Sequence, residues 1–220
     1  MTAPVEDALV VQQILASFFP STAYVCAKHI SNYEIHPEEE AVVAGAVVRR
    51  RWEFSTGRAL AREGLQRLGF PDDPIGVGRL YDPRWPEGVR GAISHDGEIC
   101  AVTMMRKADR AARFGIDLIW LDRENCMADL GQLFVSNRKE LSIMSAFGLD
   151  VDTELLLFSF KESLVKALSI EVGYFIDLKE MEISANPGGI SVRLGEKVWT
   201  ALLHGAIAHR YLVTAVTLAE

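Results

Sequence analysis

"FSFKESLVKAL", residues 158–168, places three charged side chains inside an otherwise apolar run. As a helix, it has one stripe of large apolar side chains, made of Leu157, Phe160, Leu164 and Leu168. Glu162 and Lys166 share another face, four residues apart. A Glu–Lys pair at this spacing is also a common surface feature worth about 0.2–0.5 kcal/mol. Because the flanking residues are too apolar for a solvated face, we expect these two charges to face a functional site.

The strand-like stretch "FGIDLIWL", residues 114–121, contains one ionisable side chain, Asp117. Strand alternation places Asp117 on the same face as Gly115 and Ile119. Burying a carboxylate is costly unless it is paired or binds a metal, so Asp117 is a second candidate site residue. A cap or a salt bridge at the strand end is the alternative.

A third candidate is Ser94–His95 in "GAISHDG", residues 91–97. Adjacent strand residues point to opposite faces, and the chain has no Gly-x-Ser-x-Gly stretch, so a nucleophilic triad is disfavoured. Hydroxyl and imidazole groups near the arginine-rich segment 49–67 are better suited to phosphate binding.

Composition narrows the class of protein. The 220 residues carry a net charge of −7, which gives no general attraction to nucleic acid. The three cysteines are scattered without a Cys-x-x-Cys pair, so we expect no disulfide framework or structural zinc. No apolar run has membrane-spanning length, and the N-terminus lacks the features of a secretory signal. We expect a cytoplasmic protein.

The pattern of apolar residues and of Gly and Pro predicts a mixture of helices and strands. Helices are expected at 5–19, from Pro37 towards Gly69 as one or two segments, at 124–146 and at 153–169. Strands are expected at 22–30, 89–94, 99–105, 114–121, 180–184, 190–194 and 211–218, with residues 70–86 as a loop. A boundary near 107–113 gives two α+β lobes, residues 1–110 and 111–220.

The order of the three motifs is more specific than any one of them. Gly-x-x-Ser-His-x-Gly is followed by Gly-Ile-Asp and then by Phe-Ser-x-Lys-Glu-Ser-x-x-Lys-Ala. With "RRWEFSTGRALAR" and "DPRWPEGVRGAISH" upstream, residues 34–185 resemble the 4'-phosphopantetheinyl transferase superfamily, in its two-lobed bacterial branch that includes the enterobactin-synthesis enzymes.

The resemblance implies a fold and a reaction. The fold would be two pseudo-symmetric α+β lobes with the active site, and coenzyme A, in the cleft between them. The enzyme would be a magnesium-dependent monomer that transfers 4'-phosphopantetheine from coenzyme A to a serine of an acyl- or peptidyl-carrier protein. The other product would be adenosine 3',5'-bisphosphate. The pathway would be secondary metabolism: a siderophore, a nonribosomal peptide or a polyketide.

The resemblance also implies roles for individual residues. Asp117 and Glu162 would be the metal ligands, and Glu162 is also a candidate base for the serine hydroxyl. Lys166 would hold a phosphate. The remaining contacts to the 3'-phosphate and pyrophosphate of coenzyme A would come from Ser94, His95, Arg51, Arg58 and Arg79 or Arg84.

One position departs from the family pattern. Many members carry a second acid two residues after the aspartate, where this chain has Ile119. The departure concerns metal affinity more than the reaction. Two alternatives follow: a non-catalytic protein that binds coenzyme A or a carrier protein, and an unrelated coenzyme A-dependent acyltransferase. The carrier protein and the preference for free or acylated coenzyme A do not follow from the sequence.

Overall fold

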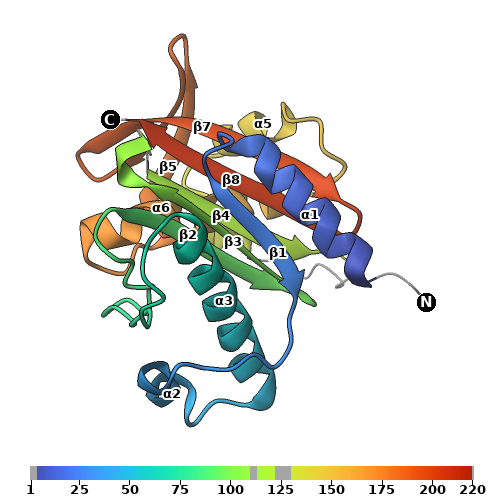
Figure 1. The fold of residues 1–220 in the computed structure, drawn as a ribbon. Coiled ribbons are helices and arrows are strands. Elements are labelled where there is room, and N and C mark those ends of the chain that lie inside the picture. Colours follow the sequence, from blue (N-terminus) through green and yellow to red (C-terminus); the bar gives the residue numbers. More distant parts are fainter. Residues whose placement is uncertain (1–3, 110–112, 122–129, 220) are drawn as a thin grey trace. The chain divides into compact units, whose positions relative to one another are not determined.

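The computed structural model describes residues 4–109, 113–121 and 130–219, and the chain forms two compact units, Met1–Ala111 and Ala112–Glu220. Figure 1 shows the elements coloured along the chain. No helix in the described ranges is both long enough and apolar enough to cross a membrane.

The first unit is built on a three-stranded antiparallel sheet of order β1-β3-β2. Its elements are α1 (Pro4–Phe18), β1 (Tyr24–His29), α2 (Pro37–Val43), α3 (Val48–Arg67), β2 (Val89–Asp96), β3 (Ile99–Arg106) and the 3-10 turn Lys107–Asp109. The long helix α3 packs against all three strands, and its residues Leu60, Ala61 and Leu65 are buried in the core. The expected helix after Pro37 is thus two helices, separated around Gly45.

The second unit has a five-stranded antiparallel sheet of order β4-β8-β7-β6-β5. Its elements are β4 (Arg113–Trp120), α4 (Gly131–Phe134), α5 (Lys139–Ser145), α6 (Thr153–Val172), the 3-10 turn Leu178–Glu180, β5 (Met181–Asn186), β6 (Gly189–Leu194), β7 (Lys197–Ala208) and β8 (Tyr211–Ala219). The helix expected at 124–146 is α4 and α5 in its described part, and residues 124–129 lie outside the described ranges.

The two units repeat one topology. In each, a strand leads through a short helix and a long helix to a hairpin, and the last strand pairs between the other two. Thus β1, α2, α3, β2 and β3 correspond to β4, α5, α6, β7 and β8, with the β5–β6 hairpin as an addition to the second unit. The predicted α+β fold of two pseudo-symmetric lobes is confirmed.

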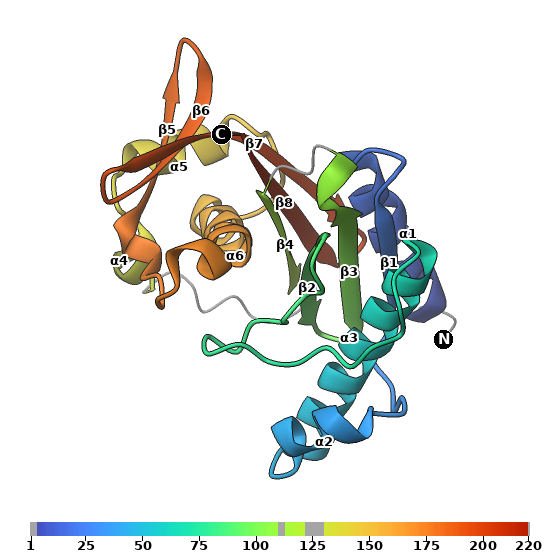
Figure 2. The same ribbon diagram turned by 60° about the vertical axis from the view of Figure 1, so that its left-hand side comes forward.

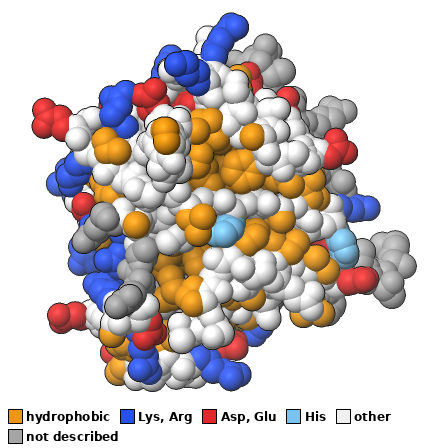
Figure 3. Space-filling model, turned by 90° about the horizontal axis from the view of Figure 1, so that it is seen from above, with side chains coloured by type: hydrophobic (Ala, Val, Ile, Leu, Met, Phe, Trp, Pro, Cys, Tyr) orange, Lys and Arg blue, Asp and Glu red, His pale blue; other side chains and the backbone are white. Residues whose placement is uncertain are grey.

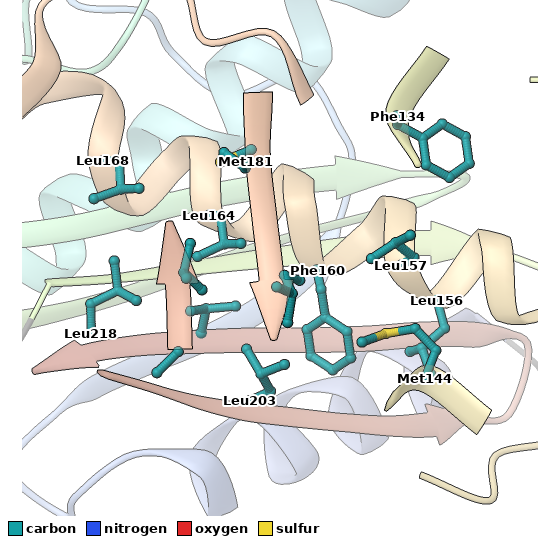
Figure 4. Packing of buried hydrophobic residues seen from close by; sticks show 14 of the residues in the cluster. Phe134, Met144, Leu156, Leu157, Phe160, Leu164, Leu168, Met181, Leu203 and Leu218 are labelled. Atoms are coloured by element: carbon teal, nitrogen blue, oxygen red, sulfur yellow. The ribbon is translucent and has the colours of Figure 1, made fainter. Parts of the chain in front are cut away.

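Helix α6 is the centre of the second unit. Asp152 caps its start by accepting hydrogen bonds from the N–H groups of Glu154 (2.7 Å) and Leu155 (3.3 Å), and Gly173 ends it with φ of 70°. Figure 2 shows the helix nearly end-on, with β4 and β8 on one side and α4 and α5 on the other. In Figure 4, Phe160 and Leu164 point from the helix towards the sheet that carries Leu203. The predicted apolar stripe of α6 is its buried face.

Strand β7 was not expected from the sequence. Trp199, Ala201 and Leu203 alternate into the core, while Val198 and Leu202 on the opposite face are exposed. Apolar side chains on both faces obscure the period of two that predicts a half-buried strand. Figure 3 shows hydrophobic side chains gathered on the surface seen from above.

Candidate active site

Strand β4 lies close to α6 because Gly115 has no side chain. A Cβ at this position would be 2.9 Å from the carbonyl carbon of Ser163 and 3.0 Å from the amide nitrogen of Ala167, and it would collide with the Ser163 carbonyl oxygen. All three atoms belong to the α6 backbone, which has no rotamer that could relieve the contact. The close approach brings the next residue on the same strand face, Asp117, within reach of α6.

The carboxylate of Asp117 is buried and is bound from two sides. It is 6 % exposed; the Lys166 ammonium lies 2.7 Å from its Oδ1, and the Ser159 hydroxyl lies 2.9 Å from its Oδ2. Lys166 also donates to the Ile116 carbonyl oxygen at 2.9 Å. Asp117 is therefore part of a partly buried ion pair with α6, rather than an isolated cap at the strand end.

Glu162 is near both members of that pair. Burial raises the pKa of the Glu162 carboxyl above its ordinary value; the Lys166 charge opposes the shift, and the Asp117 charge adds to it. Within the described ranges no hydrogen bond to the Glu162 carboxylate is found. The structure thus brings together the predicted trio Asp117, Glu162 and Lys166, with one carboxylate available to a ligand.

The neighbouring lysine has a different role. Lys161 is fully buried, lies 3.1 Å from Glu140, and donates to the carbonyl oxygens of Phe134 (2.6 Å) and Met181 (2.7 Å). Glu140 in turn accepts from the Ile183 N–H at 2.9 Å. Burial lowers the pKa of Lys161, and the Glu140 charge opposes that shift. This ion pair joins α6 to α5 and β5, so Lys161 belongs to the scaffold.

The first unit contains a matching contact. On α2, the buried Glu39 accepts from Arg62 of α3 at 2.8 Å and from the Ile75 N–H at 2.7 Å. In both units, a buried glutamate on a seven-residue helix binds a cation on the following long helix and the N–H of an isoleucine beyond it. We use the term glutamate hub for Glu39 and Glu140 with these partners.

The first unit places one arginine and one glutamate beside His95. The His95 Nε2 lies 3.0 Å from the Arg50 guanidinium, and Glu53 lies 3.7 Å from its Nδ1. Ser94, on the opposite face of β2, is buried. Arg51 points elsewhere: its guanidinium donates to Glu40 at 2.6 Å and to the Val43 carbonyl oxygen at 3.0 Å. The structure therefore places Arg50 beside His95, and it pairs Arg51, a predicted contact to coenzyme A, with Glu40.

Arg58 is an unusual buried cation. It is 4 % exposed, its guanidinium lies 4.7 Å from the centre of the Phe54 ring, and its Nε has no hydrogen-bond partner among the described residues. Burial lowers the pKa of Arg58 to about 10, so it is still charged at neutral pH. Arg79 and Arg84 lie exposed in the loop between α3 and β2. No described contact joins these two arginines to His95 or Arg58.

Comparison with known proteins gives two family matches. A model of the 4'-phosphopantetheinyl transferase N-terminal domain matches residues 38–105, and a model of the 4'-phosphopantetheinyl transferase superfamily matches residues 113–216. The chain belongs to the 4'-phosphopantetheinyl transferase superfamily. The two matches fall in the two structural units, and they contain the His95 surroundings and the trio on β4 and α6 respectively.

Several relatives of this transferase family are similar over part of their length. The 4'-phosphopantetheinyl transferase Svp of Streptomyces mobaraensis is 39% identical over 166 residues, 73% of this chain and 65% of Svp. The transferase PptT of Mycobacterium tuberculosis is 35% identical over 116 residues, 50% of each chain. Enterobactin synthase component D of Salmonella typhi is 33% identical over 125 residues, 56% of this chain and 50% of that protein. The matches thus span from half to just under two thirds of these relatives.

The donor set of the candidate site is compatible with a hard divalent cation. Within the described ranges there is no group of three or more His, Cys, Asp or Glu side chains that could hold a metal. The two carboxylates of Asp117 and Glu162 are nevertheless close enough for the Asp117 charge to raise the pKa of Glu162. Magnesium commonly uses one or two protein carboxylates and completes its shell with substrate phosphates and water, so the two acids fit this ion. Ile119, on the same strand face, packs against the core cluster and offers no side-chain donor.

Sequence reasoning missed several participants in these contacts, of which three show why. Thr214 of β8 is fully buried and hydrogen-bonded beside Asp117, but its sequence context is that of an ordinary strand. Glu140, the partner of Lys161, lay in a helix expected on periodicity alone. Arg50 stands next to the selected Arg51 in a run of three arginines, which contains no signal for choosing among them.

Proposed function

We propose that this chain transfers the 4'-phosphopantetheine group of coenzyme A to a serine of an acyl- or peptidyl-carrier protein. The trio Asp117, Glu162 and Lys166 carries the proposal, because two carboxylates and an ammonium group meet in the unit that matches the superfamily model. The similarity to phosphopantetheinyl transferases and to an enterobactin synthase component supports this reaction class.

The reaction is a displacement at phosphorus. The carrier serine oxygen forms a bond to the phosphorus that bears the pantetheine arm, and the bond from that phosphorus to the bridging oxygen breaks. The bridging oxygen keeps the electron pair, so adenosine 3',5'-bisphosphate leaves. The serine proton moves to the Glu162 carboxylate, whose raised pKa suits a base at neutral pH. Lys166 offsets negative charge on the phosphate oxygens, where such stabilisation is the main source of rate.

Asp117 and Glu162 would hold a magnesium ion in this proposal. When bound, the ion would neutralise charge on the pyrophosphate oxygens. In the ligand-free chain, Lys166 provides the countercharge of Asp117 at 2.7 Å. Lys166 is only partly buried, so its flexible side chain has room to move towards a phosphate. Water, which magnesium retains readily, would take the coordination site that a second acid at position 119 fills in other family members.

The first unit supplies candidate contacts for the phosphates of coenzyme A. Arg58 is the strongest of them, because a buried guanidinium whose Nε lacks a described partner is stabilised by binding an anion. Arg50 and His95 form an exposed pair that suits a second phosphate oxygen. Ser94, Arg51, Arg79 and Arg84 stay in the proposal as predicted contacts; in the ligand-free chain the Arg51 guanidinium is hydrogen-bonded to Glu40 and to the Val43 carbonyl oxygen.

The test is mass spectrometry of apo carrier proteins incubated with the full chain, coenzyme A and magnesium. We expect a phosphopantetheine mass increase on the carrier serine, lost when magnesium is chelated and strongly reduced in Glu162→Gln. If coenzyme A binds while every carrier remains unmodified, the chain is the non-catalytic binding protein. If a carrier gains an acyl group without magnesium, the acyltransferase alternative is correct.

The biological setting is part of the same proposal. A siderophore, nonribosomal peptide or polyketide pathway is consistent with the similarity to enterobactin synthase component D. Cytoplasmic location and the monomeric state stay predictions from the sequence. Gel filtration coupled to light scattering would measure the oligomeric state directly.

A further inference from the structure

The Asp117 carboxylate is the end of a chain of buried hydroxyl groups. Ser159 Oγ lies 2.9 Å from Asp117 Oδ2 and 2.8 Å from Thr214 Oγ1, and Ser163 Oγ lies 3.0 Å from the same Thr214 oxygen. Asp117 is 6 % exposed and the three hydroxyl residues are fully buried. These side chains are hydrogen-bonded to each other inside an otherwise apolar interface between the sheet and α6.

The positions of the four residues follow from two regular spacings. Asp117 on β4 and Thr214 on β8 are directly opposite each other in the antiparallel register, so both side chains lie on the sheet face that α6 covers. Ser159 and Ser163 are four residues apart and lie on one face of α6. A shift of one residue in either element would separate the hydroxyls from the carboxylate.

The chain of hydroxyls has one direction. An ionised carboxylate only accepts hydrogen bonds, so Ser159 must donate its proton to Asp117. Ser159 then has no proton left for Thr214, and Thr214 must donate to Ser159. By the same reasoning Ser163 donates to Thr214. All three O–H dipoles therefore point towards Asp117, and such aligned chains strengthen each bond in turn.

We propose that Ser159, Thr214 and Ser163 are positioning residues that fix Asp117 in its metal-binding orientation before the cation arrives. This inference rests on the proposed function, in which Asp117 is a metal ligand. By occupying Oδ2, the hydroxyl chain leaves Oδ1, now paired with Lys166, as the oxygen available to the cation. Hydrogen-bonding partners behind metal ligands have this effect in other metal sites, where their loss typically costs about 10–100-fold in affinity or activity.

The direction of this hydroxyl chain predicts that removing a hydroxyl weakens cation binding more when that hydroxyl lies closer to Asp117. Ser159→Ala removes the direct donor to Asp117 and should weaken cation binding most, by about tenfold or more. Thr214→Val, which keeps the side-chain shape, should weaken it by a smaller factor, and Ser163→Ala least. A general loss of packing at this interface would not follow that order.

The experiment measures Mn²⁺ binding to the full chain by isothermal titration, with thermal melting as the check on folding. Thr214→Ser retains the hydroxyl and loses the methyl group, so it should bind Mn²⁺ within about twofold of wild type, whereas Thr214→Val should not. Thr103→Val is the matched control. It changes a fully buried threonine of the first unit whose hydroxyl has no hydrogen-bond partner among the described residues.

The outcomes separate the inference from the proposed function. Equal Mn²⁺ affinity for Thr214→Val, Thr214→Ser and wild type overturns the inference, as does a Thr214→Ser variant that folds but binds as weakly as Thr214→Val. A wild-type chain that binds no Mn²⁺ overturns it as well. Carrier modification is assayed separately. If the variants show the expected order of Mn²⁺ affinities but the wild type modifies no carrier, only the proposed function is overturned.

Discussion

Gly115→Ala tests the close approach of β4 and α6 on which the candidate site depends. The new Cβ would lie 2.9 Å from the carbonyl carbon of Ser163 and 3.0 Å from the nitrogen of Ala167, whereas carbon atoms in contact prefer about 3.5–4.0 Å. Helix α6 must therefore move away by at least roughly 0.5–1 Å, since the collision with the Ser163 carbonyl oxygen needs a larger shift than these two contacts. Such a shift stretches the 2.9 Å contact between Ser159 and Asp117 beyond the usual hydrogen-bond range, which ends at about 3.2 Å.

The expected cost is about 2 kcal/mol. Overpacking a well-packed interface costs about 1–3 kcal/mol, and we take the upper end because backbone atoms are struck. Replacing Gly by Ala in the unfolded chain returns about 0.4–1 kcal/mol. For a chain of this length the difference lowers Tm by roughly 4–8 °C. The rate of transfer to the carrier should fall as well, because Asp117 is no longer within hydrogen-bond distance of the α6 side chains.

Differential scanning calorimetry measures the shift, and Gly45→Ala is the control. An added Cβ at Gly45 meets nothing within 4 Å, so this variant keeps the gain from the unfolded chain and should melt at, or up to about 4 °C above, the wild-type Tm. If Gly115→Ala melts like Gly45→Ala and transfers at the wild-type rate, the described contact between β4 and α6 is wrong.

Three further predictions concern the charged residues of α6. Lys161→Met should lower the free energy of unfolding by about 3–5 kcal/mol, because it leaves Glu140 buried without its cation. Chemical denaturation measures this loss. The control is Lys28→Met, which removes an exposed ion pair and should cost at most about 1 kcal/mol. Lys166→Ala should weaken coenzyme A binding about tenfold or more in calorimetric titration, with a smaller stability loss than Lys161→Met; the reverse pattern would make Lys166 structural. Glu162→Gln should strongly reduce carrier modification and should be at least as stable as wild type at pH 7. Because the pKa of Glu162 is raised in the folded state, the folded state keeps a proton that the unfolded state has already lost at the same pH. The free energy of unfolding of the wild type should therefore fall as the pH rises from the unfolded pKa through the folded pKa of Glu162. Chemical denaturation at pH 4 and at pH 7 should show a smaller difference between the two pH values in Glu162→Gln than in the wild type.

The parts of the fold that were predictable from the sequence have a clear periodicity in their apolar residues. Helix α6 has an apolar stripe at the helical period and an aspartate cap, and β4 is an apolar strand with a single acid, so both elements were predictable. Strand β7 was missed because apolar residues on both faces hide its alternation. The helix expected at 124–146 ends after Phe134 in its described part, and there the Ser136 hydroxyl donates to the carbonyl oxygens of Lys179 and Met181. A local pattern does not contain such contacts with distant residues.

The missing site residues depend on long-range contacts. A buried threonine such as Thr214 looks like any β-branched residue of a strand, and its register against Asp117 is fixed only by the β4–β8 pairing. Arg50 and Arg51 differ by about 100° around α3, so which of them faces His95 depends on how that helix is rotated. Local sequence determines neither the pairing nor the rotation.

The glutamate hubs favour an origin of the two units from one repeated half. Each hub joins corresponding elements of two units with the same topology, so the simplest history has one ancestral half, already containing the buried acid, that was copied and fused. The acid–lysine chemistry of α6 and the arginine-rich face of α3 would then be later and separate acquisitions, one in each copy. Residues of the hubs should consequently vary together with their partners among descendants of either half, whereas the chemistry of one copy is free to change without the other.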